Sequence, residues 1–454
     1  MLGFRSRLER CTPKKHTMGL QGYELSCGFK GCEAMSRLIV QGGRPVRGEL
    51  PVHGAKNSAL PILTSAILCD TPSVIHNCPD LSDVDASCSI LRYLGCGVIR
   101  DTTNGTIRID ATGAEKYDIP VELMREMRSS IVFLGAICAQ LGRARISFPG
   151  GCELGPRPID LHLAALRQLG VVIEEDHGWL NCYTFGRLRG ANIALSFPSV
   201  GATENIMLAA VKAQGTTVIV NAAREPEIED LASFLSRCGA KITGAGESVM
   251  TIEGVETLHG CEYSVMPDRI VAATYMAAAA ITGGNLLLKG VNVSHLSPVI
   301  PIFREMGCLV ETEGSMLQIR RSGLLRPVKY VRTMPYPGFP TDAQAPVMAV
   351  STLANGTSIF IENIFENRYK HAAELVRLGA RIKTEGKVAI VEGVSTLYGA
   401  PVEATDLRGG AALVVAALAA EGETVITGLR HIDRGYESIE KAFAAVGADI
   451  TRLL

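Results

Sequence analysis

The chain has 454 residues, which is more than one hydrophobic core usually supports, so we expect two domains. Its 45 basic and 46 acidic side chains leave a net charge of -1, which excludes a strong overall attraction to nucleic acid or to a membrane surface. The 13 cysteines form no paired C-x2-C framework, which favours reduced thiols in a cytoplasmic protein without a zinc site. The most apolar segments are shorter than the roughly 20 residues of a membrane span.

Residues 1–34 differ in composition from the rest of the chain. Basic residues recur in this segment, but it has no continuous apolar stretch, so the sequence does not predict a secretory signal. We interpret the segment as a disordered tail or the product of an upstream start, with Met35 opening the folded chain.

The dominant feature after Met35 is an internal repeat. Six times a helical pattern ends in a hydrophobic-Gly step and continues as a strand, with about 70 residues between successive steps. Each unit is predicted to contain a short apolar helix, a β-branched strand, an amphipathic helix and a β-hairpin. The glycines of the steps are Gly95, Gly170, Gly239, Gly307, Gly379 and Gly447.

A unit of this size cannot bury its apolar faces alone, so the six copies are expected to pack as two groups of three. We predict a first domain at residues 56–266 and a second at 267–454, completed by residues 35–55 with the opening strands SRLIVQGG and GELPV. The chain then crosses between the domains near residues 52–56 and 265–267, and these crossings are predicted to form a hinge.

Each apolar helix begins with polar or charged residues, as in KNSALP, MRSSIV, ATENIM, PDRIVA, TDAQAP and LRGGAA. A helix N-terminus has unpaired amides and a partial positive charge, which suit anions. Taken singly, Asn57 is equally well explained as a cap and Arg128 as an exposed side chain. Because such groups recur at one point of the repeat, we predict a strongly anion-attracting cleft where the helices converge.

Loops between the strand and the amphipathic helix form a second recurring position. They place Cys152, Arg157, Arg368 and Arg434 at corresponding points of their units. A buried cysteine is usually an inert apolar residue, but that interpretation fits Cys152 poorly because it follows Gly150 and Gly151 directly. We predict a mobile loop that carries a reactive thiol.

Over residues 35–454 these motifs resemble the UDP-N-acetylglucosamine 1-carboxyvinyltransferases. Glu153 and Leu154 of the cysteine loop and the N-terminal extension depart from the family pattern. The resemblance lies in HGAKNSALP with Lys56 and Asn57, MRSSI with Arg128, PGGCELGPRPIDLH with Cys152 and Arg157, PSVGATENIMLAA, FPTDAQA with Asp342, FENRYKH with Arg368, DLRGGAA with Arg408 and HIDRGYE with Arg434.

The resemblance implies an inside-out α/β barrel fold of two domains, with small-molecule substrates in the cleft and no cofactor or metal. It also implies a role for each matching residue. The residues implied to surround phosphoenolpyruvate or its phosphate are Lys56, Arg128, Arg157, Arg408 and Arg434. Those implied to hold the uridine diphosphate are Arg157, Pro158, Ile159, Asp160, Leu161, Ser199, Val200 and Gly201, and those at the amino sugar are Asn57, Thr341, Asp342 and Ile364, with Arg368 as a further substrate-binding residue.

The implied reaction moves the enolpyruvyl group of phosphoenolpyruvate to the 3-hydroxyl of UDP-N-acetylglucosamine, the first committed step of peptidoglycan synthesis. Asp342 is the candidate base, Lys56 supplies charge or a proton, and Arg434 joins them as a catalytic cation. Cys152 has three open roles, which are proton donation, a covalent adduct with phosphoenolpyruvate, and assistance to product release.

Two alternatives are a shikimate-pathway enolpyruvyl transferase and a catalytically silent paralogue that binds UDP-sugar. The Gly-Gly-Cys loop and the PSVGATEN segment favour the nucleotide-sugar acceptor. The presence of Lys56, Cys152, Asp342 and Arg434 together argues against a silent paralogue.

Overall fold

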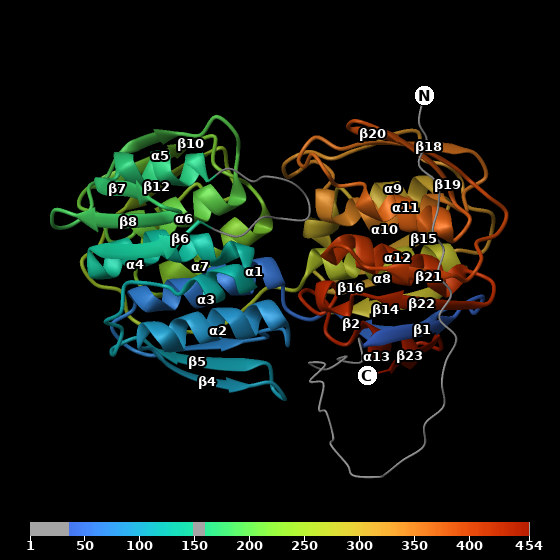
Figure 1. Ribbon diagram of the computed structural model, residues 1–454, viewed down its shortest axis with the longest axis horizontal. Helices are drawn as coiled ribbons and strands as arrows, with labels where there is room; N and C mark the ends of the chain where they lie inside the picture. The colour runs from blue at the N-terminus through green and yellow to red at the C-terminus, as the bar shows by residue number, and fades with distance from the viewer. Residues whose placement is uncertain (1–35, 149–158, 454) are drawn as a thin grey trace, which may run out of the picture. The chain divides into compact units, whose positions relative to one another are not determined.

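The computed structural model describes residues 36–148 and 159–453 (Figure 1). The predicted tail at residues 1–34 and the loop residues Cys152, Arg157 and Pro158 lie outside the described residues. No helix in the described ranges is both long enough and apolar enough to cross a membrane.

A buried helix opens each repeat, as predicted. These helices are apolar on every side, which is typical of a helix surrounded by protein. Asp268 and Asp406 cap two of them by accepting hydrogen bonds from backbone amides of the first turn. The helices are α1 (Lys56–Ser65), α4 (Phe133–Leu141), which continues the 3-10 helix η2 (Arg128–Val132), α6 (Val200–Ala210), α8 (Arg269–Thr282), α10 (Thr341–Ser351) and α12 (Leu407–Ala419).

An amphipathic helix follows later in each unit and ends beside the predicted glycine. Gly95 caps α2 with φ 105, a left-handed conformation that glycine adopts without steric strain, and the other five step glycines also have positive φ. The helices are α2 (Ser82–Leu94), α5 (Asp160–Gln168), α7 (Pro226–Arg237), α9 (Ile300–Glu305), α11 (Lys370–Arg377) and α13 (Ile439–Ala445). The remaining helices are α3 (Val121–Glu126) and the 3-10 helices η1 (Ala66–Leu68), η3 (Val293–Leu296) and η4 (Leu429–His431).

Within the described ranges, the strands form six separate sheets, one for each repeat. Three of them follow the orders β13 (Glu262–Ser264)-β3 (Ser73–His76)-β5 (Thr106–Asp110)-β4 (Gly97–Asp101), β6 (Arg143–Ser147)-β8 (Trp179–Thr184)-β7 (Val171–Asp176) and β11 (Lys241–Thr243)-β12 (Val249–Glu253)-β10 (Thr216–Val220)-β9 (Asn192–Ala194). The other three follow β15 (Leu309–Glu313)-β16 (Met316–Arg320)-β14 (Asn285–Lys289)-β2 (Arg47–Pro51), β17 (Val331–Arg332)-β18 (Thr357–Ile361)-β20 (Val388–Glu392)-β19 (Arg381–Glu385) and β21 (Pro401–Glu403)-β22 (Glu423–Thr427)-β1 (Arg37–Gln41)-β23 (Asp449–Leu453).

The structure contains several short edge strands that the predicted repeat unit did not include. Strands β9, β13, β17 and β21 pair in parallel with the main strand of a sheet and have only two or three residues each. A segment so short carries no readable alternation of apolar and polar residues, so sequence patterning could not reveal it.

The two opening strands pair with the far end of the chain and its middle. Strand β1 lies between β22 and β23, with Leu38 opposite both Ile426 and Arg452. It therefore takes the place of the second hairpin strand in the sixth unit. Strand β2 runs parallel to β14, with Leu50 opposite Leu288.

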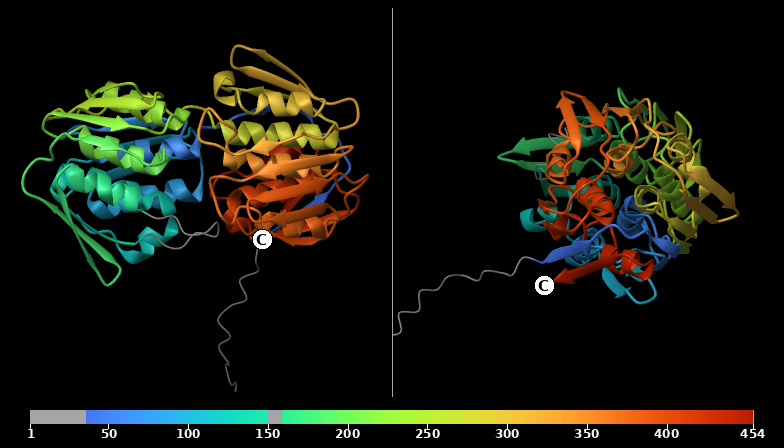
Figure 2. Two further views of the ribbon diagram at one scale, coloured as in Figure 1. Left: turned by 90° about the horizontal axis from the view of Figure 1, so that it is seen from above. Right: turned by 90° about the vertical axis from the view of Figure 1, so that its right-hand side faces the viewer.

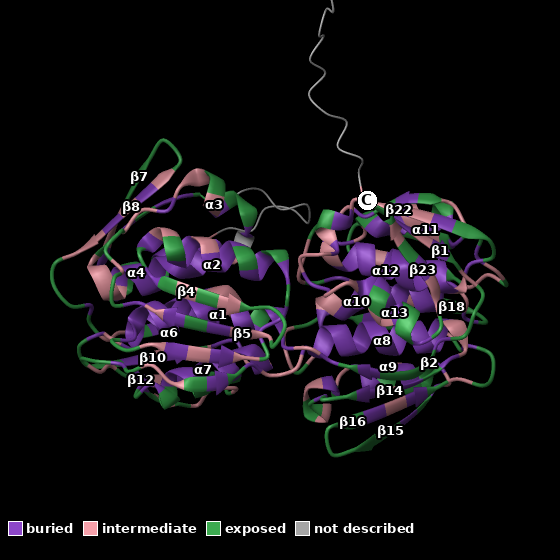
Figure 3. Ribbon diagram, turned by 90° about the horizontal axis from the view of Figure 1, so that it is seen from below, coloured by how far each residue is buried: buried purple, intermediate pink, exposed green. Residues whose placement is uncertain are grey.

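Buried apolar residues form two clusters, coloured as buried in Figure 3. The first core contains residues between Ala59 and Val265, and the second contains Leu38–Val52 together with residues from Val271 to Ile450. Helices α8, α10 and α12 pack against one another in the second core, with strands around them (Figure 2). On these two cores we propose the domain boundaries predicted above.

Candidate active site

The N-terminal ends of the buried helices meet at a cleft of about 610 Å³. Its lining includes Lys56 at the start of α1, Val200 of α6, Arg269 of α8, Thr341 of α10 and Arg408 of α12. The cleft therefore receives the partial positive charge of several helix ends.

Most of the predicted site residues that the structure describes line this cleft. They are Lys56, Asn57, Ile159, Ser199, Val200, Gly201, Thr341, Asp342, Ile364, Arg368, Arg408 and Arg434. Asp160 and Leu161 open α5 but are not among the lining residues. Arg128 begins η2, but its side chain lies outside the described part, as do Cys152, Arg157 and Pro158.

Asp342 is held between two arginines. Its Oδ1 accepts a hydrogen bond from Arg368 Nη2 at 3.0 Å, and its Oδ2 accepts from Arg408 Nη2 at 3.1 Å and Nε at 3.2 Å. Both guanidinium groups are almost completely buried, whereas the Asp342 side chain is 27% exposed toward the cleft. Burial alone lowers the pKa of Arg408, but Asp342, Tyr436 and Asp268 together outweigh it, so the pKa of Arg408 is raised.

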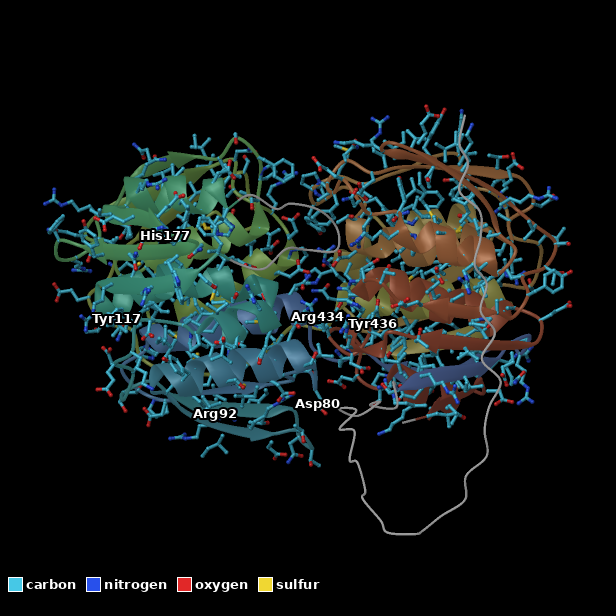
Figure 4. All side chains as sticks on the ribbon, in the orientation of Figure 1. Asp80, Arg92, Tyr117, His177, Arg434 and Tyr436 are labelled. Carbon is cyan, nitrogen blue, oxygen red and sulfur yellow. The ribbon has the colours of Figure 1, made fainter. Side chains whose placement is uncertain are left out.

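Asp83 holds a second pair of cations. Its Oδ2 lies 2.6 Å from Lys56 Nζ, and its Oδ1 accepts from Arg434 Nε at 2.8 Å. Arg434 is labelled in Figure 4. Burial raises the pKa of Asp83, but Lys56 and Arg434 more than offset it, so the pKa is lowered and the carboxylate stays charged. Burial and the neighbouring Arg434 lower the pKa of Lys56 despite the opposing effect of Asp83.

Further carboxylates set the backbone around the site. Glu362 Oε1 accepts from the amides of Ile364 at 2.7 Å and Phe365 at 3.0 Å, and its Oε2 accepts from Thr341 Oγ1 at 3.0 Å. Asp406 Oδ1 accepts from the amide of Arg408 at 3.1 Å and so fixes the first turn of α12. These contacts position Thr341, Ile364 and Arg408 on the cleft wall.

An acidic edge borders the start of α6 and α7. Arg269 pairs with Glu227 through Nε at 3.0 Å and Nη2 at 3.2 Å, and Glu225 accepts from the amide of Tyr336 at 3.2 Å. The pKa of Glu204 is raised well above its usual value by burial and by the charges of Glu227 and Glu225. Burial and the neighbouring carboxylates thus favour the neutral form of Glu204.

At one end of the cleft, the start of α6 packs closely against His162 of α5. Ser199 caps α6 by accepting from the amide of Ala202 at 3.3 Å. A Cβ on Gly201 would lie 3.1 Å from His162 Cε1, so a larger residue would crowd that ring. Burial lowers the pKa of His162 to about 4, which keeps the imidazole neutral.

The charge of the cleft departs from the prediction in one respect. The described lining carries Asp83, Glu126, Glu204, Glu225, Glu227, Asp342 and Asp406 beside Lys56, Arg125, Arg269, Arg368, Arg408 and Arg434. The predicted cations are thus largely matched by carboxylates. Buried cations require such partners, because desolvating an unpaired charge costs far more than a paired one.

Sequence analysis missed Asp83, Glu362, Asp406 and Arg269. Asp83, Asp406 and Arg269 stand at helix starts, a signal that was available, whereas Glu362 acts through contacts that no local pattern reveals. Among the residues described, no group of three or more His, Cys, Asp or Glu could hold a metal ion.

Comparisons with known proteins address the family and the fold of the chain. A family model described as EPSP synthase (3-phosphoshikimate 1-carboxyvinyltransferase) matches residues 40–443. The chain is 53% identical over 420 residues to UDP-N-acetylglucosamine 1-carboxyvinyltransferase 2 of Caldanaerobacter subterraneus subsp. tengcongensis, covering 92% of this chain and 100% of that protein. It is 49% identical over 437 residues to UDP-N-acetylglucosamine 1-carboxyvinyltransferase 1 of Symbiobacterium thermophilum, covering 96% and 98%.

Solved structures share the fold. The enolpyruvyl transferase NikO from Streptomyces tendae matches with a TM-score of 0.84 at 26% identity, over 92% of this chain and 99% of that one. An EPSP synthase from Acinetobacter baumannii matches with a TM-score of 0.73 at 19% identity, over 92% and 100%, and supports the fold alone. The predicted enolpyruvyl transferase-like α/β fold is confirmed. The chain belongs to the UDP-N-acetylglucosamine 1-carboxyvinyltransferase family.

Proposed function

We propose that this protein transfers the enolpyruvyl group of phosphoenolpyruvate to the 3-hydroxyl of UDP-N-acetylglucosamine and releases phosphate. The reaction is the first committed step of peptidoglycan synthesis, and we place it in the cytoplasm. Cell shape and division then depend on it, and a phosphonate epoxide such as fosfomycin is the expected inhibitor.

One observation carries the proposal beyond family membership. In the cleft, two carboxylates each hold two cations, with Asp83 between Lys56 and Arg434 and Asp342 between Arg368 and Arg408. This pairing keeps the cations ordered before an anionic substrate arrives, and it supports a site for a donor with both a carboxylate and a phosphate.

We assign the donor phosphate and carboxylate to Lys56, Arg408 and Arg434. Each cation must partly exchange its aspartate for a substrate oxygen when the donor binds. Such an exchange offsets much of the desolvation cost, because the cation is already buried and paired before binding. These buried ion pairs also argue against an anion-binding site on the protein surface, where water would hydrate each cation.

We assign proton removal from the sugar 3-hydroxyl to Asp342. While Arg368 and Arg408 both contact it, both carboxylate oxygens already accept hydrogen bonds. Transfer of Arg408 to the donor frees Oδ2 of Asp342 to accept the proton of the sugar hydroxyl. Donor binding therefore prepares the base.

The chemistry follows from these assignments. A proton added to C3 of phosphoenolpyruvate makes C2 electrophilic, and the sugar oxygen attacks C2 as its proton passes to Asp342. Loss of a proton from C3 and cleavage of the C–O bond to phosphate complete the transfer. Cys152 keeps its three candidate roles, because it lies outside the described residues.

The direct test mixes purified protein with phosphoenolpyruvate and UDP-N-acetylglucosamine and follows phosphate release and product mass. We expect one phosphate per enolpyruvyl nucleotide sugar formed. A parallel reaction uses shikimate 3-phosphate as the acceptor. Turnover with shikimate 3-phosphate alone would identify the shikimate-pathway alternative, and UDP-sugar binding without turnover would identify a silent paralogue.

A further inference from the structure

Three cysteines from distant parts of the chain meet at the edge of the first core, where Cys69 and Cys238 belong to the core and Cys261 packs against it. Cys69 follows η1, Cys238 is the residue after α7, and Cys261 precedes β13. The Sγ atoms of Cys238 and Cys261 are 3.5 Å apart, and the Cys69 thiol is hydrogen-bonded to that of Cys238. We refer to these residues as the thiol cluster.

Backbone hydrogen bonds hold the three segments in place. The Cys238 carbonyl accepts from the amide of His259 at 3.0 Å, and the Cys261 carbonyl accepts from the amide of Val74 at 2.9 Å. The amide of Asp70 donates to the carbonyl of Leu258 at 2.8 Å. The thiols are therefore kept in contact by the fold.

The members of the cluster differ in exposure and acidity. Cys69 and Cys238 are buried, whereas Cys261 is partly exposed to solvent. The hydrogen bond with Cys238 lowers the pKa of Cys69, and the nearby Lys212 acts in the same direction against the effect of burial. The pKa of Cys261 is raised, chiefly by burial, although the hydrogen bond from Cys238 opposes this effect. The partial exposure of Cys261 opens it to a small reagent, in the same cluster as a Cys69 thiol whose pKa is lowered.

Simple core packing accounts poorly for this arrangement. Cys308, in the second core, is a buried cysteine without a described thiol neighbour and behaves as a small apolar residue. The thiol cluster instead gathers three sulfurs at a point that solvent reaches. Among the described residues, no group of three or more His, Cys, Asp or Glu is suited to hold a metal ion. The specific role that remains for the thiol cluster is chemistry of the sulfur atoms themselves.

We propose that Cys238 and Cys261 form a reversible disulfide when the protein meets a hydroperoxide, with Cys69 able to exchange into it. The Cys261 sulfur attacks the outer oxygen of the hydroperoxide and the O–O bond breaks, which leaves a sulfenic acid and releases the corresponding alcohol, or water when the oxidant is hydrogen peroxide. The Cys238 sulfur then attacks the sulfenic sulfur, and the S–O bond breaks to release one water. Two thiols lose two electrons and two protons, and the hydroperoxide is reduced.

The disulfide would tie α7 to the segment that leads out of the first core. Asp230 of α7 accepts from the amide of Met266 at 3.2 Å, just beyond β13, and it also accepts from the Ser58 hydroxyl at the start of α1. A covalent link at the other end of α7 would add to these contacts. We therefore expect slower local opening of α7 and β13 in the oxidised protein.

The experiment treats the full-length protein with increasing hydrogen peroxide, blocks the remaining thiols with an alkylating agent and maps the peptides by mass. The expected product is a Cys238–Cys261 linked peptide that dithiothreitol removes, with slower amide hydrogen exchange in residues 226–264. Cys261→Ser should abolish that link, whereas the matched change Cys308→Ser should leave it intact. Cys261→Ala serves as a second variant if the serine disturbs folding.

Every outcome bears on the proposal. A Cys69–Cys238 link in the Cys261→Ser protein would support exchange within the cluster. A wild-type protein that forms no Cys238–Cys261 link while other cysteines are oxidised would overturn the proposal. So would a link that forms equally well in denatured protein, because it would owe nothing to the fold.

Discussion

Replacing Asp342 by asparagine removes a charge from the cleft with little change in shape. The Asp342 carboxylate accepts hydrogen bonds from both Arg368 Nη2 and Arg408 Nε, at 3.0 and 3.2 Å. Asparagine can still accept one hydrogen bond through its single carbonyl oxygen, but it cannot neutralise the guanidinium groups or take a proton at neutral pH. Asp342→Asn therefore tests the base and the charge pairing together.

The expected falls in turnover and in stability have separate causes. Loss of a positioned general base typically costs about 10²–10⁴-fold in rate, which sets the expected fall in turnover. The side chains of Arg368 and Arg408 are 2% and 3% exposed, whereas that of Asp342 is 27% exposed. Removing one partner of a fully buried ion pair costs about 3–5 kcal/mol, so for this partly open site we expect about 2–3 kcal/mol of lost stability.

The assay measures steady-state turnover, UDP-N-acetylglucosamine binding by calorimetry and unfolding in denaturant. We expect turnover to collapse while nucleotide-sugar affinity changes only several-fold. Asp101→Asn is the matched control, because Asp101 is an exposed aspartate at the end of β4 that accepts from Asn104. Near-normal turnover in Asp342→Asn, or an equal loss in Asp101→Asn, would refute the assignment.

Three further predictions concern other groups. Asp83→Asn should lower stability by about 3–5 kcal/mol, because it leaves Lys56 without its buried counter-ion, and an unchanged denaturant midpoint would contradict this. Burial lowers the pKa of His371 from 6.5 to about 4, so the unfolded chain binds the extra proton first as pH falls. The contribution of His371 to stability should therefore be full above about pH 6.5 and decline toward pH 4. His371→Gln should flatten that decline when unfolding is measured as a function of pH. A small phosphonate epoxide should alkylate Cys152, faster with UDP-N-acetylglucosamine present and far less in Cys152→Asp; a peptide map with the adduct on another cysteine would count against the reactive loop.

The sequence alone was sufficient for the features that depend on local pattern. The hydrophobic-Gly step predicted where α2 ends at Gly95, because only glycine adopts that left-handed turn without strain. The apolar stretch after Thr341 predicted a buried helix whose polar start lies at a cleft, because a helix N-terminus retains unpaired amides. Because such signals repeat in every unit, they were sufficient to predict the fold class.

Only the tertiary structure decided which charges meet. Arg434 lies 351 positions from Asp83 in the sequence, yet their side chains are joined by a 2.8 Å hydrogen bond. The same holds for the pairing of Asp342 with Arg408 and for the contact between Cys238 and Cys261. These partners come together through tertiary packing between segments that no local pattern links. Buried charges and thiols acquire their chemistry from neighbours that the sequence order does not reveal.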